Sequence, residues 1–202
     1  MAVAGVLLFW AGVFIAGARV EGYSAREDYI SSLASRGSPV AVLGIGALLA
    51  SAVAHVTTAW AALKAWRSRL FATFLGLAGL ATSVVAVFRA SCPDGPPGCA
   101  LTETSSGDWV DAVHGGSVGG YELVVLASML TLAIGALRRT SKWPRWLGLV
   151  SLMFAVGSVL LIGQTNSDDV GMWQRLWLAN NLCWVLIVAL VATRSMDWSV
   201  RR

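Results

Sequence analysis

One stretch of the sequence, residues 108–122, carries ionisable side chains at the spacing of a helix face. Residues three or four apart share a face of a helix, so Asp108, Asp111 and His114 would form a ladder. Glu122 lies about three turns beyond Asp111 and returns to the same side. An imidazole beside a carboxylate is a usual arrangement for proton transfer, and it could equally supply two metal ligands. The alternative is a polar helix start that caps the helix and packs against loops.

Glu122 lies deeper in an apolar stretch, where an unpaired charge costs about 2.5–3.5 kcal/mol. It must therefore be protonated, paired or next to a wet cavity. Arg89 and Arg175 stand at the same ends of neighbouring apolar stretches and are candidate partners. Together with Arg19 they could instead bind a phosphate or carboxylate head group. The alternative for each arginine is snorkelling to the membrane interface.

The second histidine, His55, is predicted to lie too deep to act together with His114. Counted from Pro39, it is about 24 Å from the outer end of its stretch at the helical rise, whereas His114 is about one turn inside. This separation argues against a bis-histidine haem, and against a multi-histidine zinc hydrolase. Asn180 and Asn181 are candidate hydrogen-bond partners for His55. Whether the protein binds a metal or another cofactor stays open.

Two further features allow alternative interpretations. The glycines at 115, 116, 119 and 120 form small-xxx-small pairs, which favour close helix contact, with a substrate groove as the alternative. Asp168 and Asp169 could bind a divalent cation or lie in a solvated turn. No phosphate-binding loop, dinucleotide fingerprint, nucleophile elbow or His-Glu-x-x-His motif occurs, and nothing indicates nucleic acid.

Composition indicates that a membrane must position these residues. The 202 residues are 56% hydrophobic and only 13% charged, against about 25% charged in soluble domains. Six stretches approach the roughly 20 apolar residues that span a bilayer: about 2–18, 39–62, 70–88, 110–137, 146–163 and 176–193. No Lys or Arg precedes the first stretch, so we expect a retained helix and not a signal peptide. The sequence predicts an all-α, six-helix transmembrane bundle in a single domain, 1–202.

The charges predict the orientation of this bundle in a cell membrane. Ten of the fifteen basic residues follow the second, fourth and sixth stretches, whereas nine of the eleven acids lie at the other ends. The positive-inside rule then places both termini in the cytoplasm. The loops after the first, third and fifth stretches (loops one, three and five) would be extracytoplasmic. Cys92 and Cys99 share loop three, where Pro and Gly turns could allow a disulfide bond; two free thiols are the alternative.

Loop one and the tryptophans are predicted to lie at the membrane interface. Ser24 and Glu27 have the spacing of a capping box that opens a short helix, with Tyr29, Ile30 and Leu33 toward lipid or protein. The predicted interfacial anchors are Trp60, Trp66, Trp143, Trp146 and Trp198 on the inner side, and Trp109, Trp173 and Trp177 on the outer side.

Several short motifs occur in a recognisable order along the chain. They are Tyr23-Ser24 with Asp28 after the first stretch, Arg89 with Asp94 after the third, His114, and Gly171 with Gln174-Arg175 before the last. In these motifs the sequence resembles an uncharacterised integral-membrane family, domain of unknown function 998. The resemblance implies six helices and outward-facing polar motifs, and no established activity. The matched positions (Tyr23, Ser24, Asp28, Asp94, His114 and Arg175) would share one side of the membrane, as the residues of a site would.

These observations favour an integral membrane protein with an outward-facing polar cavity. It would bind or process a lipid-like or isoprenoid-like amphiphile, with Asp111 and His114 for proton transfer or metal binding and Arg89 and Arg175 at an anionic head group. One alternative is a non-catalytic membrane subunit or assembly factor. Another is a small proton-coupled transporter that uses Glu122 and His55. Membrane lipids, a small amphiphile and a membrane-protein partner are the expected contacts.

Overall fold

The computed structural model describes residues 1–91, 109–138, 143–165 and 168–200, with side chains as far as Met196. These residues are helical and contain no strand. The α-helices are α1 (Ala2–Gly17), α2 (Ala41–Trp66), α3 (Arg69–Val87), α5 (Trp109–Leu137), α6 (Arg145–Ile162) and α7 (Val170–Val200), with a short 3-10 helix, η1 (Ile30–Ala34).

Five of these helices, α2, α3, α5, α6 and α7, are long and apolar enough to cross a membrane. The sixth, α1, is apolar but has only 16 residues. Large apolar side chains point outward, such as Leu123 with 70% and Met153 with 72% of the residue exposed. Such a surface is unfavourable in water and suits lipid. The all-α, multi-pass architecture is therefore confirmed, whereas the sidedness of the loops stays a prediction.

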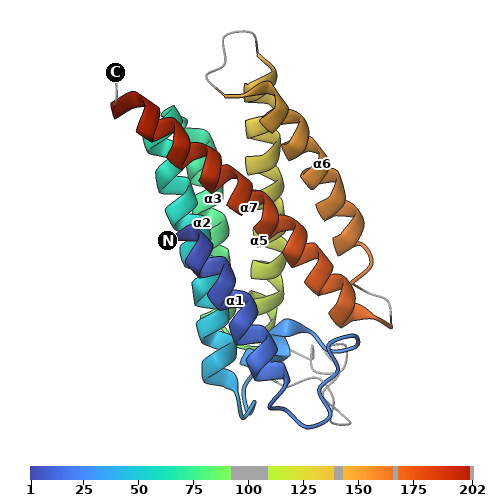
Figure 1. Cartoon of the computed structure of the whole chain (residues 1–202). Coiled ribbons are helices and arrows are strands. Elements are labelled where there is room, and N and C mark those ends of the chain that lie inside the picture. Colours follow the sequence, from blue (N-terminus) through green and yellow to red (C-terminus); the bar gives the residue numbers. More distant parts are fainter. Residues whose placement is uncertain (92–108, 139–142, 166–167, 201–202) are drawn as a thin grey trace.

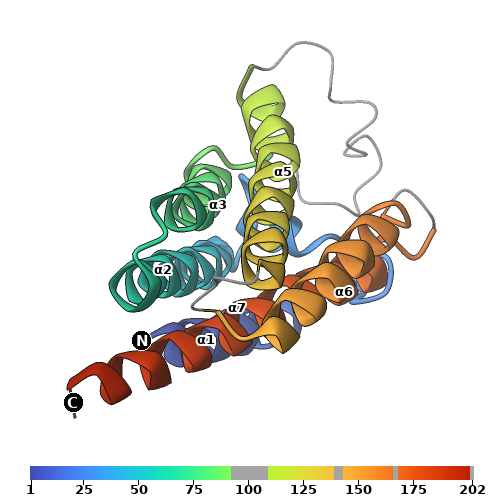
Figure 2. The same ribbon diagram turned by 90° about the horizontal axis from the view of Figure 1, so that it is seen from above.

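The helices form one bundle in which the last helix closes the structure. In sequence order α1 packs on α2, α2 on α3, α3 on α5, and α5 on α6. Helix α7 runs obliquely across the bundle and contacts α6, α2 and α1 (Figures 1 and 2). Loop one (18–40) lies at the lower end of Figure 1, where α7 begins. We call this end, with the described residues 18–40, 88–91, 163–165 and 168–169, the loop end.

Small residues permit close contact between helices, but not at the predicted glycines. A Cβ on Gly5 of α1 would lie 2.6 Å from the Ala50 carbonyl oxygen of α2. A Cβ on Gly44 would lie 2.6 Å from the Leu33 carbonyl carbon, so η1 also sits directly on α2. By contrast, no atom of the described residues is within 4 Å of a Cβ built at 115, 116, 119 or 120. The prediction of close helix contact at those positions is therefore wrong for the described part of this chain.

Two of the predicted interfacial tryptophans are core residues instead. Trp66 packs against the rings of Phe71 and Trp143, and Trp177 is 3% exposed. Trp60, Trp109 and Trp146 are more than half exposed, as interfacial side chains would be. Hydropathy and position in the sequence do not distinguish the buried tryptophans from the exposed ones, because both kinds lie near helix ends.

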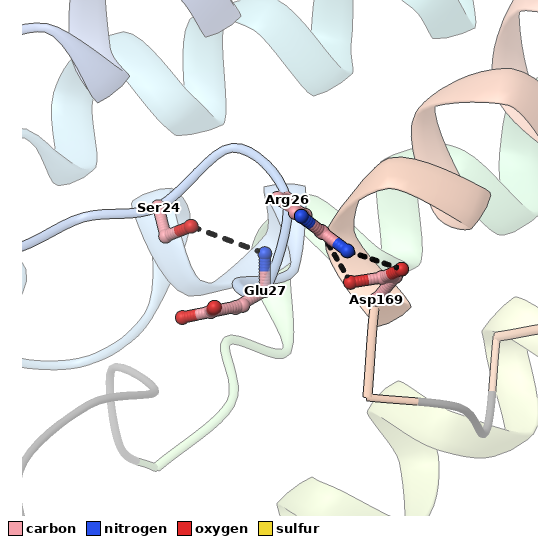
Figure 3. Close-up of polar contacts among 4 residues, drawn as sticks. All are labelled: Ser24, Arg26, Glu27 and Asp169. Carbon is pink, nitrogen blue, oxygen red and sulfur yellow. Dashed lines mark hydrogen bonds and ion pairs between the residues drawn. The ribbon is translucent and has the colours of Figure 1, made fainter.

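The predicted helix in loop one begins later than its capping sequence. The Ser24 hydroxyl accepts a hydrogen bond from the Glu27 N–H at 3.3 Å, as a capping box requires (Figure 3). The reciprocal bond comes from Asp28, whose Oδ2 accepts from the Ser24 N–H at 2.6 Å. Only a turn follows, and η1 starts at Ile30. Ile30 and Leu33 are both buried against the bundle, so they face protein.

Candidate functional site

Loop one is fastened to the first turns of α7 by a set of residues that we call the clamp: Tyr23, Asp28, Gly171, Gln174 and Arg175. Arg175 Nη1 donates to the carbonyl oxygens of Asp28 at 3.0 Å and Gly171 at 2.8 Å, and its Nη2 donates to the Tyr23 hydroxyl. Gln174 Oε1 accepts from the Ile30 N–H at 2.6 Å. Most of the polar motif residues of loop one and α7 therefore contact one another.

Glycine is required at position 171 because the two segments approach so closely. A Cβ there would lie 2.3 Å from the Asp28 carbonyl oxygen, well inside the distance at which atoms clash. The same approach lets the Met172 N–H donate to the Arg26 carbonyl at 2.9 Å. The start of α7 is thus shaped to receive loop one.

An ion pair lies beside the clamp (Figure 3). Arg26 Nε is 2.5 Å and its Nη2 is 3.1 Å from the two carboxylate oxygens of Asp169. The hydrogen bond and the charge of Arg26 lower the pKa of Asp169 below its ordinary value. Asp169, one of the two acids considered for a divalent cation, is therefore paired with an arginine.

The other end of loop one is held by the end of α3. Arg89 Nε donates to the Ala34 carbonyl at 2.7 Å, and its Nη2 donates to the Ser35 carbonyl. The Arg36 N–H donates to the Ala90 carbonyl at 2.8 Å. Arg89 and Arg175 were predicted to bind an anionic head group. The guanidinium groups of both donate hydrogen bonds to main-chain carbonyls instead.

The first turns of α5 are positioned by the residues that end α3. Asp111 accepts from the Ser91 N–H at 2.9 Å and also from the Ser91 hydroxyl. His114 Nδ1 lies 2.8 Å from the Phe88 carbonyl oxygen. A carbonyl can only accept, so Nδ1 carries the hydrogen and the neutral ring has its lone pair on Nε2. The sequence pattern correctly placed Asp111 and His114 on a shared face.

A pocket of about 490 Å³ lies at the loop end, between loop one, α5, the end of α6 and α7. Its polar lining is Tyr29, Ser31, Asp111, His114, Thr165 and Gln174. Its apolar lining includes Trp109, Val118, Ile162 and Trp177. On α5 the lining residues Asp111, His114, Gly115 and Val118 follow the helical spacing of one face.

A smaller cavity of about 50 Å³ adjoins this pocket on the side of the core. The two share Ser31, Val118, Gln174 and Trp177 as walls. Beyond these walls the smaller cavity is mainly apolar, with Phe9, Leu48, Val85 and Leu178 in its lining. A pocket with polar groups in its lining and a mainly apolar recess are therefore neighbours that share these walls.

Glu122 lies behind one wall of the pocket and does not line it. Its carboxylate Oε2 is 2.9 Å from both the Ser158 hydroxyl and Trp177 Nε1, whereas Oε1 has no partner among the described residues. The expected pairing of Glu122 with Arg89 or Arg175 is wrong, because both arginines are held by loop one and the carbonyls around it. The residue is 6% exposed.

His55 is fully buried, and its partner differs from the expected ones. Its Nδ1 donates to the Ser51 carbonyl at 2.8 Å, and its Nε2 accepts from the Tyr121 hydroxyl at 3.2 Å. The expected bond to Asn180 or Asn181 is therefore wrong. Asn180 Nδ2 donates to the Phe154 carbonyl at 2.9 Å and so ties α7 to α6 instead.

The predicted site residues thus lie in several different places. Asp111, His114 and Gln174 line the pocket, while Tyr23, Asp28, Arg175 and again Gln174 form the clamp, with Ser24 beside it. Arg89 holds loop one from α3, and Glu122 lies behind Trp177. Cys92, Cys99, Asp94 and Asp108 lie outside the described residues. Within the described part of the chain, no three His, Cys, Asp or Glu side chains gather as a metal site would require.

Other pocket residues were not among the sequence candidates: Tyr29, Ser31, Trp109, Thr165 and Trp177. Helical spacing could have found one of them. Trp177 follows Gln174 by three residues, just as His114 follows Asp111, so each pair shares a helix face. Tyr29, Ser31 and Thr165 carry no such signal, because they come from loops.

Comparison with known proteins yields one match. A family model described as a protein of unknown function, DUF998, matches residues 3–191, which is nearly the whole chain. No curated protein and no solved structure matches the chain.

Proposed function

The chain belongs to the family of unknown function DUF998, and we propose that it is a membrane protein that binds a lipid-like amphiphile in the pocket at the loop end. The polar part of the ligand contacts Asp111 and His114, and its apolar part runs toward the recess beside Leu48 and Val85.

The observation that carries this proposal is that a pocket with polar groups in its lining adjoins a mainly apolar recess. The pocket volume of about 490 Å³ falls within the range of small-molecule sites, about 300–1,000 Å³. Most such sites are apolar with a few polar groups that fix the ligand's orientation. An amphiphile has this same division into two parts.

Asp111 and His114 in the pocket lining can accept a hydrogen bond or a proton from a ligand. The Phe88 carbonyl fixes the tautomer of His114 so that Nε2 is the acceptor. Each carboxylate oxygen of Asp111 takes one bond from Ser91 and keeps a further lone pair. Proton transfer from a ligand hydroxyl or ammonium group to His114 is the step that this pair could support.

A pair of glycine substitutions tests whether the pocket is the binding site. Gly115 lines the pocket and Gly116 does not, while a Cβ added at either position meets no neighbouring atom of the described residues within 4 Å. Gly115→Phe should therefore fill the pocket, and Gly116→Phe should project outward. The measurement is calorimetric binding of octanol to the protein in lipid nanodiscs, with empty nanodiscs subtracted.

We expect octanol to bind the unaltered protein and Gly116→Phe equally, and Gly115→Phe at least about tenfold more weakly. Equal binding by all three proteins would contradict the proposal. Thermal unfolding of both variants provides the control for folding, because both substitutions replace a helical glycine and should raise helix propensity by similar amounts.

A second candidate function is that of a non-catalytic membrane subunit. The observation that favours it is the open space around Gly116, Gly119 and Gly120 on α5, where a helix of another chain could approach closely. Native mass spectrometry from a mild detergent would reveal a persistent complex if this candidate is correct. A monomer alone would count against it.

A further inference from the structure

We infer that the pocket selects an amphiphile with a positively charged ammonium head group. This inference rests on the proposed function and specifies its ligand. The sequence motifs suggested an anionic head group, held by Arg89 and Arg175. The inferred head group has the opposite charge, because both arginines donate hydrogen bonds to main-chain carbonyls instead.

The charge that lines the pocket is negative. Among the lining residues Asp111 is the only carboxylate, and none is a lysine or arginine. Within the described residues, Asp111 accepts two hydrogen bonds, both from Ser91, which is neutral. No ion pair of the described residues involves Asp111, so its charge is available to a ligand.

The arginines at the loop end cannot readily reverse this sign. Arg175 is bound to the carbonyls of Asp28 and Gly171, Arg89 to those of Ala34 and Ser35, and Arg26 to Asp169. Redirecting Arg89 or Arg175 would leave carbonyl groups without donors, which costs about 1–3 kcal/mol for each buried group. An anionic head group would therefore have to displace the contacts that hold loop one.

Outside the pocket lining, the described part of the loop end also carries Arg19 and Arg36 of loop one. The segments 92–108 and 166–167, which lie outside the described residues, contain no Lys, Arg or His in their sequence. Together with Asp111 and Arg175, the described residues of this end carry six acids and five arginines. The charges of this end therefore nearly balance, and the preference for a cation depends on the pocket lining.

Aromatic side chains around the carboxylate complete the recognition of an ammonium group. Tyr29, Trp109 and Trp177 all line the pocket that contains Asp111. The electron-rich face of such rings attracts cations, Trp most strongly, and aromatic cages bind ammonium ligands in this way. A carboxylate and three aromatic residues in one pocket thus match an ammonium head group on an apolar chain.

Three probes that share one chain and differ in head group test the inference. Octylamine, octanol and octanoate carry a cationic, a neutral and an anionic head group at neutral pH. Each is titrated into the protein in nanodiscs of zwitterionic lipid, with empty nanodiscs subtracted. The variants are Asp111→Asn, which can still pair with Ser91, and Asp168→Asn as a control that removes an equal charge from the same end but outside the pocket lining.

We expect octylamine to bind about tenfold more tightly than octanol, and octanoate more weakly than either. Asp111→Asn should abolish the advantage of the amine and leave octanol binding unchanged, whereas Asp168→Asn should preserve that advantage. If octanoate bound most tightly, or if Asp111→Asn left the preference for the amine intact, the inference would be overturned while the proposed function stood. If none of the probes bound, both would be overturned.

Discussion

The clamp and the pocket are neighbours at the loop end, and they use the same types of residue for different purposes. In the clamp, Arg175 donates to two carbonyls and to Tyr23, so these polar groups are used within the protein. In the pocket, Asp111 and His114 each keep acceptor positions after their bonds to Ser91 and Phe88. Polar residues at one end of a bundle therefore indicate where a binding site could lie. Their hydrogen bonds within the protein then indicate which of these residues could still contact a ligand.

The two histidines show the same contrast in a simpler form. Both donate from Nδ1 to a main-chain carbonyl at 2.8 Å. In His55 the remaining nitrogen accepts from the Tyr121 hydroxyl, so the ring is fully used inside the core. His114 has no second hydrogen bond within the described residues, and it lines the pocket. We therefore expect the clamp to determine stability and the pocket to determine binding.

The largest expected effect is that of Arg175→Ala on stability. This substitution removes every bond from the guanidinium to loop one and leaves the Asp28 carbonyl without its donor. Loss of several charge-assisted bonds should lower the free energy of unfolding by about 3 kcal/mol. Thermal unfolding in detergent measures it. A variant as stable as the unaltered protein but unable to bind octanol would place Arg175 with the pocket residues instead.

Gly171→Ala should be the next most severe change to the clamp. The added methyl group would meet the Asp28 carbonyl oxygen at 2.3 Å, and the strain should lower the free energy of unfolding by about 1–3 kcal/mol. Gly116→Ala is the matched control, because its methyl group meets no described atom within 4 Å and removes a helical glycine. It should stabilise the protein by up to about 1 kcal/mol. Equal effects of the two substitutions would mean that loop one does not need the close approach.

His114→Ala is expected to separate binding from stability. Octanol affinity in nanodiscs should fall by about five- to tenfold, because the acceptor at Nε2 is lost. The free energy of unfolding should fall by only about 1 kcal/mol, through the bond to Phe88. A variant that loses stability but keeps its affinity for octanol would show that His114 belongs to the structural framework.

The smallest expected effect concerns the exposed ion pair of Arg26 and Asp169. Because Arg26 lowers the pKa of Asp169, the pair stabilises the fold above the unfolded carboxyl pKa of about 3.9. That stabilisation is lost as the pH falls through the lower pKa of the folded state. Arg26→Ala should therefore lower the melting temperature slightly at neutral pH, and less so in acid or high salt. A difference that increases in acid would contradict this interpretation of the pair.

The sequence predicted the helices well because membrane spans depend on local hydropathy. All six stretches became helices, and the largest errors lie at the two ends of α7, which runs from Val170 to Val200 instead of from about 176 to 193. The missing turn contains the polar residues Gln174 and Arg175. These side chains contact loop one, and hydropathy contains no information on that contact.

The candidate site could be predicted in its location but not in its detailed roles. Helical spacing correctly put Asp111 and His114 on one face, since this is a local property of a helix. The partners of Arg89 and Arg175 are carbonyl groups in loop one, which every residue carries and no sequence motif distinguishes. Ser158 and Trp177, the partners of Glu122, lie on two other helices, and which side chains of different helices meet depends on packing that local spacing does not contain.

Anomalous diffraction from crystals soaked with an alkylamine brominated at the end of its chain would test the central claim most directly. We predict a bromine peak in the recess near Phe9, Leu48 and Val85, with the amine within hydrogen-bond distance of Asp111. Bromine peaks confined to the outer, lipid-facing surface, with no probe between Asp111 and Trp177, would contradict it.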